Sequence, residues 1–283
     1  MSTALLEHRS GPSGTDEPLP SPAVTGPTAR PRRITVYGRF DCPWSYLAFR
    51  RAATLSTAGV EVDWRAVEPL GRDEGGHPEG FDGLPGEMDR VAGSLLAGEM
   101  LPYDLAGFRP RTSATVAAYA ESYAAGVAEP VRKVIFESFW MHGIDIGDAR
   151  TLRTLLVDQL RGSASSSEAV RDWGYSVDVT GGPISTAAWQ LVGGWAAQWR
   201  LHGKGVTPVV EVPGSPTVHG VEAVGWLGDQ LSARDLVPEL LADPVVEIPD
   251  ARELPTLGWV TETGGRWLVR RQQVLAATRP DRA

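Results

Sequence analysis

The order strand, helix, strand over residues 34–67 constrains the fold more than any other feature of this chain. Residues 34–40 are rich in β-branched and aromatic side chains and follow a Pro/Arg-rich segment, which is typical of a short strand. Residues 46–55 have a helical composition, and residues 60–67 alternate, with apolar side chains at the even-numbered positions. Such a unit requires parallel strands joined by a right-handed crossover. The sequence therefore predicts an α/β protein.

The only cysteine of the chain, Cys42, lies at the junction between the first strand and the helix. Pro43 suits the first helical position, because its missing N–H would have no partner there. A sulfur atom at this place faces unpaired backbone N–H groups and the positive end of the helix dipole, which favour thiolate over thiol. We therefore predict a nucleophilic cysteine whose sulfur is partly accessible. The alternative is a small buried side chain without reactivity, as free cysteines often are.

Charge and cysteine content exclude several classes of protein. A net charge of −8 argues against a nucleic-acid partner, which requires a basic face. One cysteine excludes an internal disulfide and a multi-cysteine zinc or iron–sulfur site, and the five histidines lack metal-binding spacing. We expect no metal and no tightly bound cofactor.

Neither a signal peptide nor a membrane helix is predicted. The first residues lack a basic start followed by an apolar core, and no apolar run approaches about 18 residues. The chain is expected to be cytoplasmic, where a lone thiol stays mostly reduced, and to have no membrane partner.

The two ends of the chain differ from its centre. Residues 1–33 are rich in Ser, Gly, Pro and Thr and have almost no apolar periodicity, which predicts a disordered tail. Residues 34–243 are expected to form the folded domain. Residues 244–283 form a C-terminal extension, in which residues 258–269 are predicted to be a β-hairpin.

Between the predicted strands lies a helical insertion, at about residues 86–201. Its predicted helices are residues 86–99, 113–123, 129–141, 148–161, 169–173 and 186–201. The last helix has an apolar stripe at helical spacing, which we expect to lie in the core rather than to bind a ligand. The stripe consists of Ala188, Leu191, Val192, Trp195 and Trp199.

After the insertion the chain returns to strands. Residues 208–212 and 217–224 are predicted to be two strands, and a turn of about four residues between them favours an antiparallel hairpin. A helix is predicted to follow over residues 228–241.

Three motifs in the right order resemble the DsbA-like thioredoxin-fold family, in particular its branch of FrnE-type oxidoreductases and 2-hydroxychromene-2-carboxylate isomerases. They are Cys42-Pro-Trp-Ser-Tyr-Leu-Ala48, the pair Arg111-Thr-Ser-Ala114 and Phe136–Asp148 in the insertion, and Gly205-Val-Thr-Pro-Val-Val210. The resemblance covers about residues 34–242. It implies a thioredoxin fold in which the all-helical insertion separates an N-terminal βαβ unit from a C-terminal ββα unit.

The resemblance also implies where substrate binds. The Thr207–Pro208 bond is expected to be cis and to lie beside Cys42, with its peptide offering backbone hydrogen bonds to a bound thiol or peptide. Pro43, Trp44, Thr207 and Pro208 are the expected substrate-binding residues. Without the resemblance, the sequence favours an ordinary trans-proline that begins a strand.

The chain departs from the FrnE-type motif at Ser45, where those members have a second cysteine. A serine cannot resolve a mixed disulfide, although its hydroxyl can donate a hydrogen bond to the Cys42 sulfur. We therefore expect Cys42 and Ser45 to be the catalytic residues of a DsbA-like thiol-disulfide oxidoreductase with a monothiol mechanism. Cys42 would form a mixed disulfide with a small-molecule thiol or a protein disulfide substrate. An external thiol, such as glutathione or an equivalent, would resolve it.

Two alternatives stay open. One is a glutathione-transferase-like or 2-hydroxychromene-2-carboxylate-isomerase-like enzyme with a thiol cofactor, although those relatives usually carry Ser at the position of Cys42. The other is a non-catalytic thioredoxin-fold protein with a vestigial Cys42. Arg39 and Asp41 flank the thiol and push its protonation in opposite directions, and the sequence does not decide between them.

Overall fold

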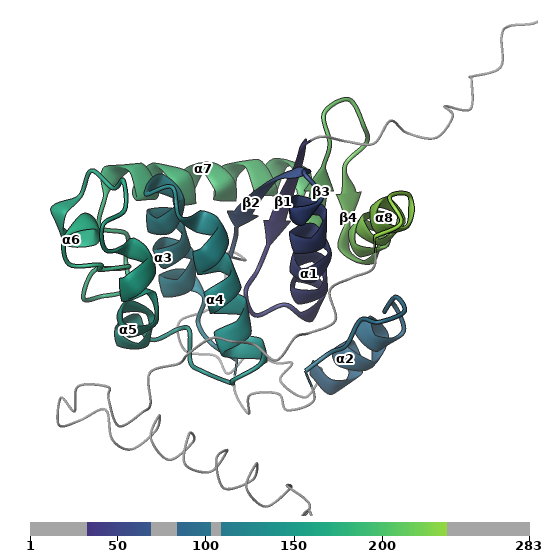
Figure 1. Cartoon of the computed structure of the whole chain (residues 1–283), viewed down its shortest axis with the longest axis horizontal. Coiled ribbons are helices and arrows are strands. Elements are labelled where there is room, and N and C mark those ends of the chain that lie inside the picture. Colours follow the sequence, from purple (N-terminus) through teal and green to yellow (C-terminus); the bar gives the residue numbers. More distant parts are fainter. Residues whose placement is uncertain (1–32, 69–83, 103–108, 237–283) are drawn as a thin grey trace, which may run out of the picture. The chain divides into compact units, whose positions relative to one another are not determined.

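The computed structural model describes residues 33–68, 84–102 and 109–236 (Figure 1). Three predictions fall wholly or partly outside these residues: the N-terminal tail, the C-terminal extension with its hairpin, and the end of the helix predicted over residues 228–241. Among the described residues, no helix is long and apolar enough to cross a membrane.

The strand–helix–strand unit is confirmed. β1 (Arg33–Gly38), α1 (Pro43–Thr57) and β2 (Glu61–Ala66) follow one another, and β1 pairs with β2 in parallel. The described sheet has four strands in the order β2-β1-β3-β4. β3 (Val209–Glu211) and β4 (Val218–His219) pair antiparallel to their neighbours, as the predicted hairpin requires. Because β1 is a central strand, the β1–α1 junction lies at the carboxyl-terminal end of an inner strand and not at the side of the sheet.

The described elements between β2 and β3 are all helices. They are α2 (Leu84–Ala92), α3 (Ser113–Ala124), α4 (Ala128–Trp140), α5 (Ala149–Leu160), α6 (Glu168–Arg171) and α7 (Thr186–His202). The predicted start of α5 is confirmed, since the Asp148 carboxylate accepts the backbone N–H of Thr151 at 2.8 Å. The predicted helix over residues 86–99 is too long, because α2 ends at Ala92, just before Gly93.

The strand predicted over residues 217–224 is wrong, because β4 has two residues and α8 (Gly220–Ser232) begins directly after it. Gly220 has φ +55°, a left-handed conformation that interrupts the strand at little cost in glycine. Val224, Leu227 and Leu231 are fully buried at helical spacing, and α8 packs on α1. The valines in this stretch fit the alternation of a strand, but the longer apolar repeat has helical spacing. The helix predicted to begin at Gly228 therefore begins at Gly220.

One aromatic cluster joins the insertion to the sheet. Phe136 of α4 stacks on Phe49 of α1 with ring centroids 4.5 Å apart, and its centroid lies 5.5 Å from that of Trp64 on β2. It also contacts Phe40 at 4.8 Å, directly before the Asp41-Cys42 pair. The insertion and the sheet therefore share one hydrophobic core, and the chain around Cys42 is held by it.

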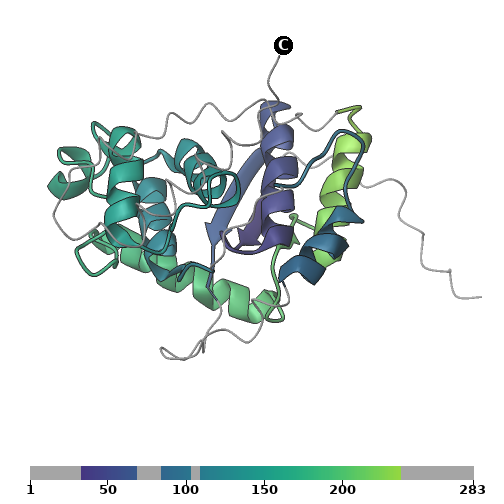
Figure 2. The ribbon, with the colours of Figure 1, turned by 90° about the horizontal axis from the view of Figure 1, so that it is seen from below.

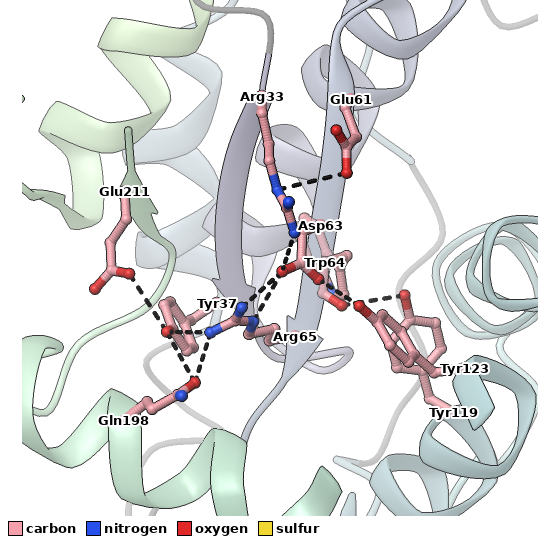
Figure 3. A network of polar contacts seen from close by, with 10 residues as sticks. All are labelled: Arg33, Tyr37, Glu61, Asp63, Trp64, Arg65, Tyr119, Tyr123, Gln198 and Glu211. Carbon is pink, nitrogen blue, oxygen red and sulfur yellow. Dashed lines mark hydrogen bonds and ion pairs between the residues drawn. The ribbon is translucent and has the colours of Figure 1, made fainter. Parts of the chain in front are cut away.

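The opposite side of the sheet carries a polar network (Figure 3). Arg65 donates to the Tyr37 hydroxyl at 2.9 Å, to Gln198 of α7 at 2.5 Å, and to Asp63 at 2.7 Å. The Asp63 carboxylate also accepts the hydroxyl of Tyr123 on α3 at 3.0 Å. Burial raises the pKa of both tyrosines, so they stay neutral donors at ordinary pH. The network ties β1 and β2 to α3 and α7.

A buried carboxylate fixes the start of α7. Glu121 is fully buried, and its Oε1 accepts the backbone N–H groups of Ile184 and Ser185 at 2.5 and 2.6 Å. Its Oε2 accepts the Ser185 hydroxyl at 2.8 Å, while the Ser185 oxygen caps the helix by accepting the N–H of Ala188 at 3.1 Å. The predicted apolar stripe of α7 lies in the core at Ala188, Trp195 and Trp199.

Glu121→Ala should lower the free energy of unfolding by about 3 kcal/mol, because three partly buried donors lose a charged, fully buried acceptor at once. Urea denaturation followed by tryptophan fluorescence measures the change. Glu129→Ala is the matched control, since its exposed carboxylate accepts a hydrogen bond from a surface hydroxyl, that of Ser56. Equal stability of the two variants would contradict the capping role of Glu121.

Candidate functional site

Cys42 is the N-cap residue of α1, and Pro43 occupies the first turn, as predicted. The Cys42 thiol donates to the carbonyl oxygen of Thr207, with Sγ and O 3.8 Å apart. The Thr207–Pro208 peptide bond is cis. The prediction of a cis bond beside Cys42 is thus confirmed, and residues 165 positions apart in the chain meet at one point.

Cys42 is more buried than predicted, because the loop before β3 packs directly on its sulfur. The residue is only 5 % exposed. It nevertheless lines a cavity of about 620 Å³, a volume that suits a small organic ligand. The sulfur therefore faces a pocket instead of an open surface.

Four segments form the walls of this cavity. The β1–α1 junction and the first turn of α1 form one wall, and α2 with the turn after it forms another. Arg109 forms part of a third wall. The fourth wall consists of the end of α7, the loop that follows it and the start of α8. The lining residues are Arg39, Cys42, Trp44, Glu87, Arg90, Gly93, Ser94, Arg109, Trp199, Gly205, Val206, Thr207, Gly220 and Val221.

The structure decides how Arg39 and Asp41 act beside the thiol. The Asp41 side chain is fully buried and accepts from Arg39 at 3.0 and 2.6 Å and from Arg109 at 2.8 Å. Both arginines line the cavity, whereas Asp41 lies behind them. Because one carboxylate is shared by two guanidinium groups, positive charge exceeds negative charge here. Among the described lining residues, Arg90 is a third cation and Glu87 is the single anion.

Ser45 is fully buried in the first turn of α1, and its hydroxyl oxygen accepts the backbone N–H of Arg39 at 3.1 Å. In the part of the chain that the structure describes, a hydrogen bond from this hydroxyl to the Cys42 sulfur is not formed. Ser45 thus holds the β1–α1 junction in place. Its Oγ marks the position at which a second thiol would lie.

The four residues predicted to bind substrate fall into two groups. Trp44 and Thr207 line the cavity. Pro43 and Pro208 are buried outside its lining and shape the backbone on either side of the sulfur. Sequence reasoning missed Arg109 and Arg90, and it assigned Trp199 to the core alone. Trp199 is 5 % exposed, donates through Nε1 to the carbonyl of Val206 at 2.9 Å, and also lines the cavity.

The geometry can be compared with known proteins. No protein-family model matches the sequence, and no curated protein matches it. A solved structure of 2-hydroxychromene-2-carboxylate isomerase is similar over 72 % of this chain and 96 % of its own, with 19 % identity and a TM-score of 0.50. The cytosolic disulfide reductase DsbM from Pseudomonas aeruginosa is similar over 72 % of this chain and 97 % of its own, with 15 % identity and a TM-score of 0.50.

At these identities the likeness establishes the fold alone. The chain has the DsbA-like thioredoxin fold, an α/β architecture, as the three sequence motifs predicted. The chemistry of the site depends on the residues that line the cavity.

Proposed function

We propose that this DsbA-like thioredoxin-fold protein is a monothiol thiol-disulfide oxidoreductase that exchanges small disulfides at Cys42. The observation that carries the proposal is the placement of the only cysteine at the start of α1, beside the cis Thr207–Pro208 peptide and in a cavity whose described lining residues include more cations than anions. A cytoplasmic location suits this chemistry, because reduced external thiols are maintained there.

The reaction would run in two exchanges. The Cys42 thiolate attacks one sulfur of a disulfide R–S–S–R′, a Cys42–S–S–R bond forms, and R′S⁻ leaves and takes up a proton. The thiolate of an external thiol R″SH then attacks the R sulfur of this mixed disulfide. R–S–S–R″ leaves and the Cys42 thiolate is restored, so that electrons and protons balance over the cycle. A second protein thiol is not required.

The cavity residues would support both exchanges. The positive end of α1 and the guanidinium groups of Arg39 and Arg109 place positive charge around the sulfur atoms, where negative charge resides before and after each exchange. Trp44 supplies an apolar surface for the substrate. The Thr207 carbonyl, which the Cys42 thiol contacts, would hold the backbone or amide of a bound thiol.

Burial favours small substrates over folded proteins. A sulfur that is 5 % exposed at the wall of a cavity of about 620 Å³ can meet a low-molecular-weight disulfide more readily than a disulfide on a protein surface. We therefore assign the role of resolving thiol to a low-molecular-weight thiol that binds reversibly, with glutathione as the first candidate.

Incubation with glutathione disulfide should give one mixed disulfide per chain, at Cys42. Intact-mass and peptide mass spectrometry measure this adduct, and excess reduced thiol should remove it. Turnover of a small mixed disulfide with reduced glutathione should fall at least 100-fold in Cys42→Ser, because the attacking sulfur is gone. Persisting turnover in that variant would favour the transferase or isomerase alternative. Wild-type protein that gives neither adduct nor turnover would favour the non-catalytic one.

A further inference from the structure

Arg51 forms a buried ion pair on the helix that carries the thiol. It lies on α1, and its side chain is 1 % exposed. Its Nε and Nη2 donate to the two carboxylate oxygens of Glu99 at 2.8 and 2.7 Å, and the Glu99 side chain is 4 % exposed. Two parallel hydrogen bonds of this kind fix both distance and orientation.

The other hydrogen bonds of this pair reach two further segments. Arg51 Nη2 donates to the carbonyl of Ser94 at 2.7 Å, and Nη1 donates to the carbonyl of Val224 on α8 at 2.6 Å. The Glu99 carboxylate also accepts the backbone N–H of Leu96 at 2.7 Å. Gly228 leaves room for the guanidinium, since a Cβ there would lie 3.0 Å from Nη1. One side chain thus joins α1 and α8 to the turn over residues 94–99.

This turn continues the cavity wall formed by α2. Glu87, Arg90, Gly93 and Ser94 all line the cavity, and Ser94 gives its carbonyl to Arg51. Figure 2 shows α2 beside α1, on which it packs. The α2 wall, defined by residues 87–94, is therefore tied to the same helix that begins at Cys42.

Stability alone is a weak reason for such a pair. Desolvating two charges costs so much that apolar residues of similar volume often give an equally stable protein. Val91 is fully buried and Met88 nearly so, and they already anchor α2 by contacts that carry little directional information. What the ion pair adds is a fixed position for the α2 wall.

We propose that Arg51 is a positioning residue that fixes the α2 wall, and with it Arg90, relative to the Cys42 sulfur. It thereby sets the preference of the cavity for anionic over neutral reagents. The inference rests on the proposed function only in taking Cys42 as the reacting atom.

Two alkylating reagents test this inference. Iodoacetate is anionic and iodoacetamide is neutral. In both reactions the Cys42 thiolate displaces iodide, so the ratio of the two alkylation rates does not depend on the fraction of Cys42 that is thiolate. The double variant Arg51→Met/Glu99→Leu removes the ion pair without a change in net charge and without a lone buried charge. We expect it to stay folded, with a urea midpoint lowered by the loss of the hydrogen bonds to Leu96, Ser94 and Val224, while the iodoacetate-to-iodoacetamide ratio falls at least threefold.

Arg51→Lys separates position from charge, because it keeps the cation and loses the bidentate geometry. Its ratio should fall as well, and it decides the question if the double variant does not fold. Arg171→Gln is the matched control, an exposed arginine paired with Asp172 outside the cavity lining, and should leave the ratio unchanged. If the folded double variant, or Arg51→Lys, keeps the wild-type ratio of alkylation rates, the positioning role of Arg51 is wrong while the proposed function is unaffected. Wild-type Cys42 that reacts with neither reagent overturns the proposed function and this inference together.

Discussion

Ser45→Cys should give the protein a dithiol activity that the wild type lacks. Residues 42 and 45 are the N-cap and third positions of α1, one turn apart, a spacing at which Cα atoms come within disulfide range. A thiol at position 45 can attack a mixed disulfide at Cys42 and release the substrate thiol in reduced form. Glutathione disulfide should oxidise this variant to a disulfide between residues 42 and 45 with release of two glutathione thiols per chain, and the stable adduct at Cys42 should disappear.

The double variant Cys42→Ser/Ser45→Cys is the matched control, because it has one thiol at the other position. It should show neither release of a second glutathione thiol nor a disulfide within the chain. The new sulfur is a weaker acceptor for the Arg39 N–H than the serine oxygen, which costs about 1 kcal/mol of stability and leaves the fold intact. Release of two glutathione thiols per chain by wild-type protein, as by Ser45→Cys, would show that a second thiol is not what the site lacks.

Asp41→Asn should lower the free energy of unfolding by about 3 kcal/mol. The substitution leaves Arg39 and Arg109, whose side chains are 13 and 15 % exposed, without the carboxylate that both contact. Loss of one negative charge behind the cavity should also raise the iodoacetate-to-iodoacetamide ratio at Cys42. Urea denaturation and the alkylation rates measure the two effects.

Asp172→Asn is the control for this prediction. Asp172 forms a similar two-point contact with Arg171, at 2.7 and 3.0 Å, but at an exposed position. Surface pairs of this kind contribute little, so its stability should not change measurably. A similarly small change in Asp41→Asn would mean that water reaches the Asp41 carboxylate, and the charge argument for the cavity would fail.

Local sequence signals predicted most of the described elements. The strand, Cys-Pro junction, helix and parallel strand over residues 33–66 are present as expected, and Asp148 begins its helix. These features depend on side-chain periodicity and on hydrogen bonds between near neighbours, which a sequence shows directly. The failure at residues 217–224 has the same origin, since a short valine-rich stretch satisfies a strand and a helix pattern alike until the wider repeat is considered.

The site divides in the same way. The sequence by itself determined that a lone sulfur begins a helix after a strand, and the family motifs added that Thr207 and Pro208 lie beside it. Only the tertiary structure decided the burial of Cys42 and the charge around it. Arg109 reaches Asp41 from 68 positions away, and Arg51 reaches Glu99 from 48. The order of charged residues in the sequence does not show where their side chains point. The folding of distant segments against one another buries the Asp41 carboxylate and leaves Arg39 and Arg109 in the cavity lining.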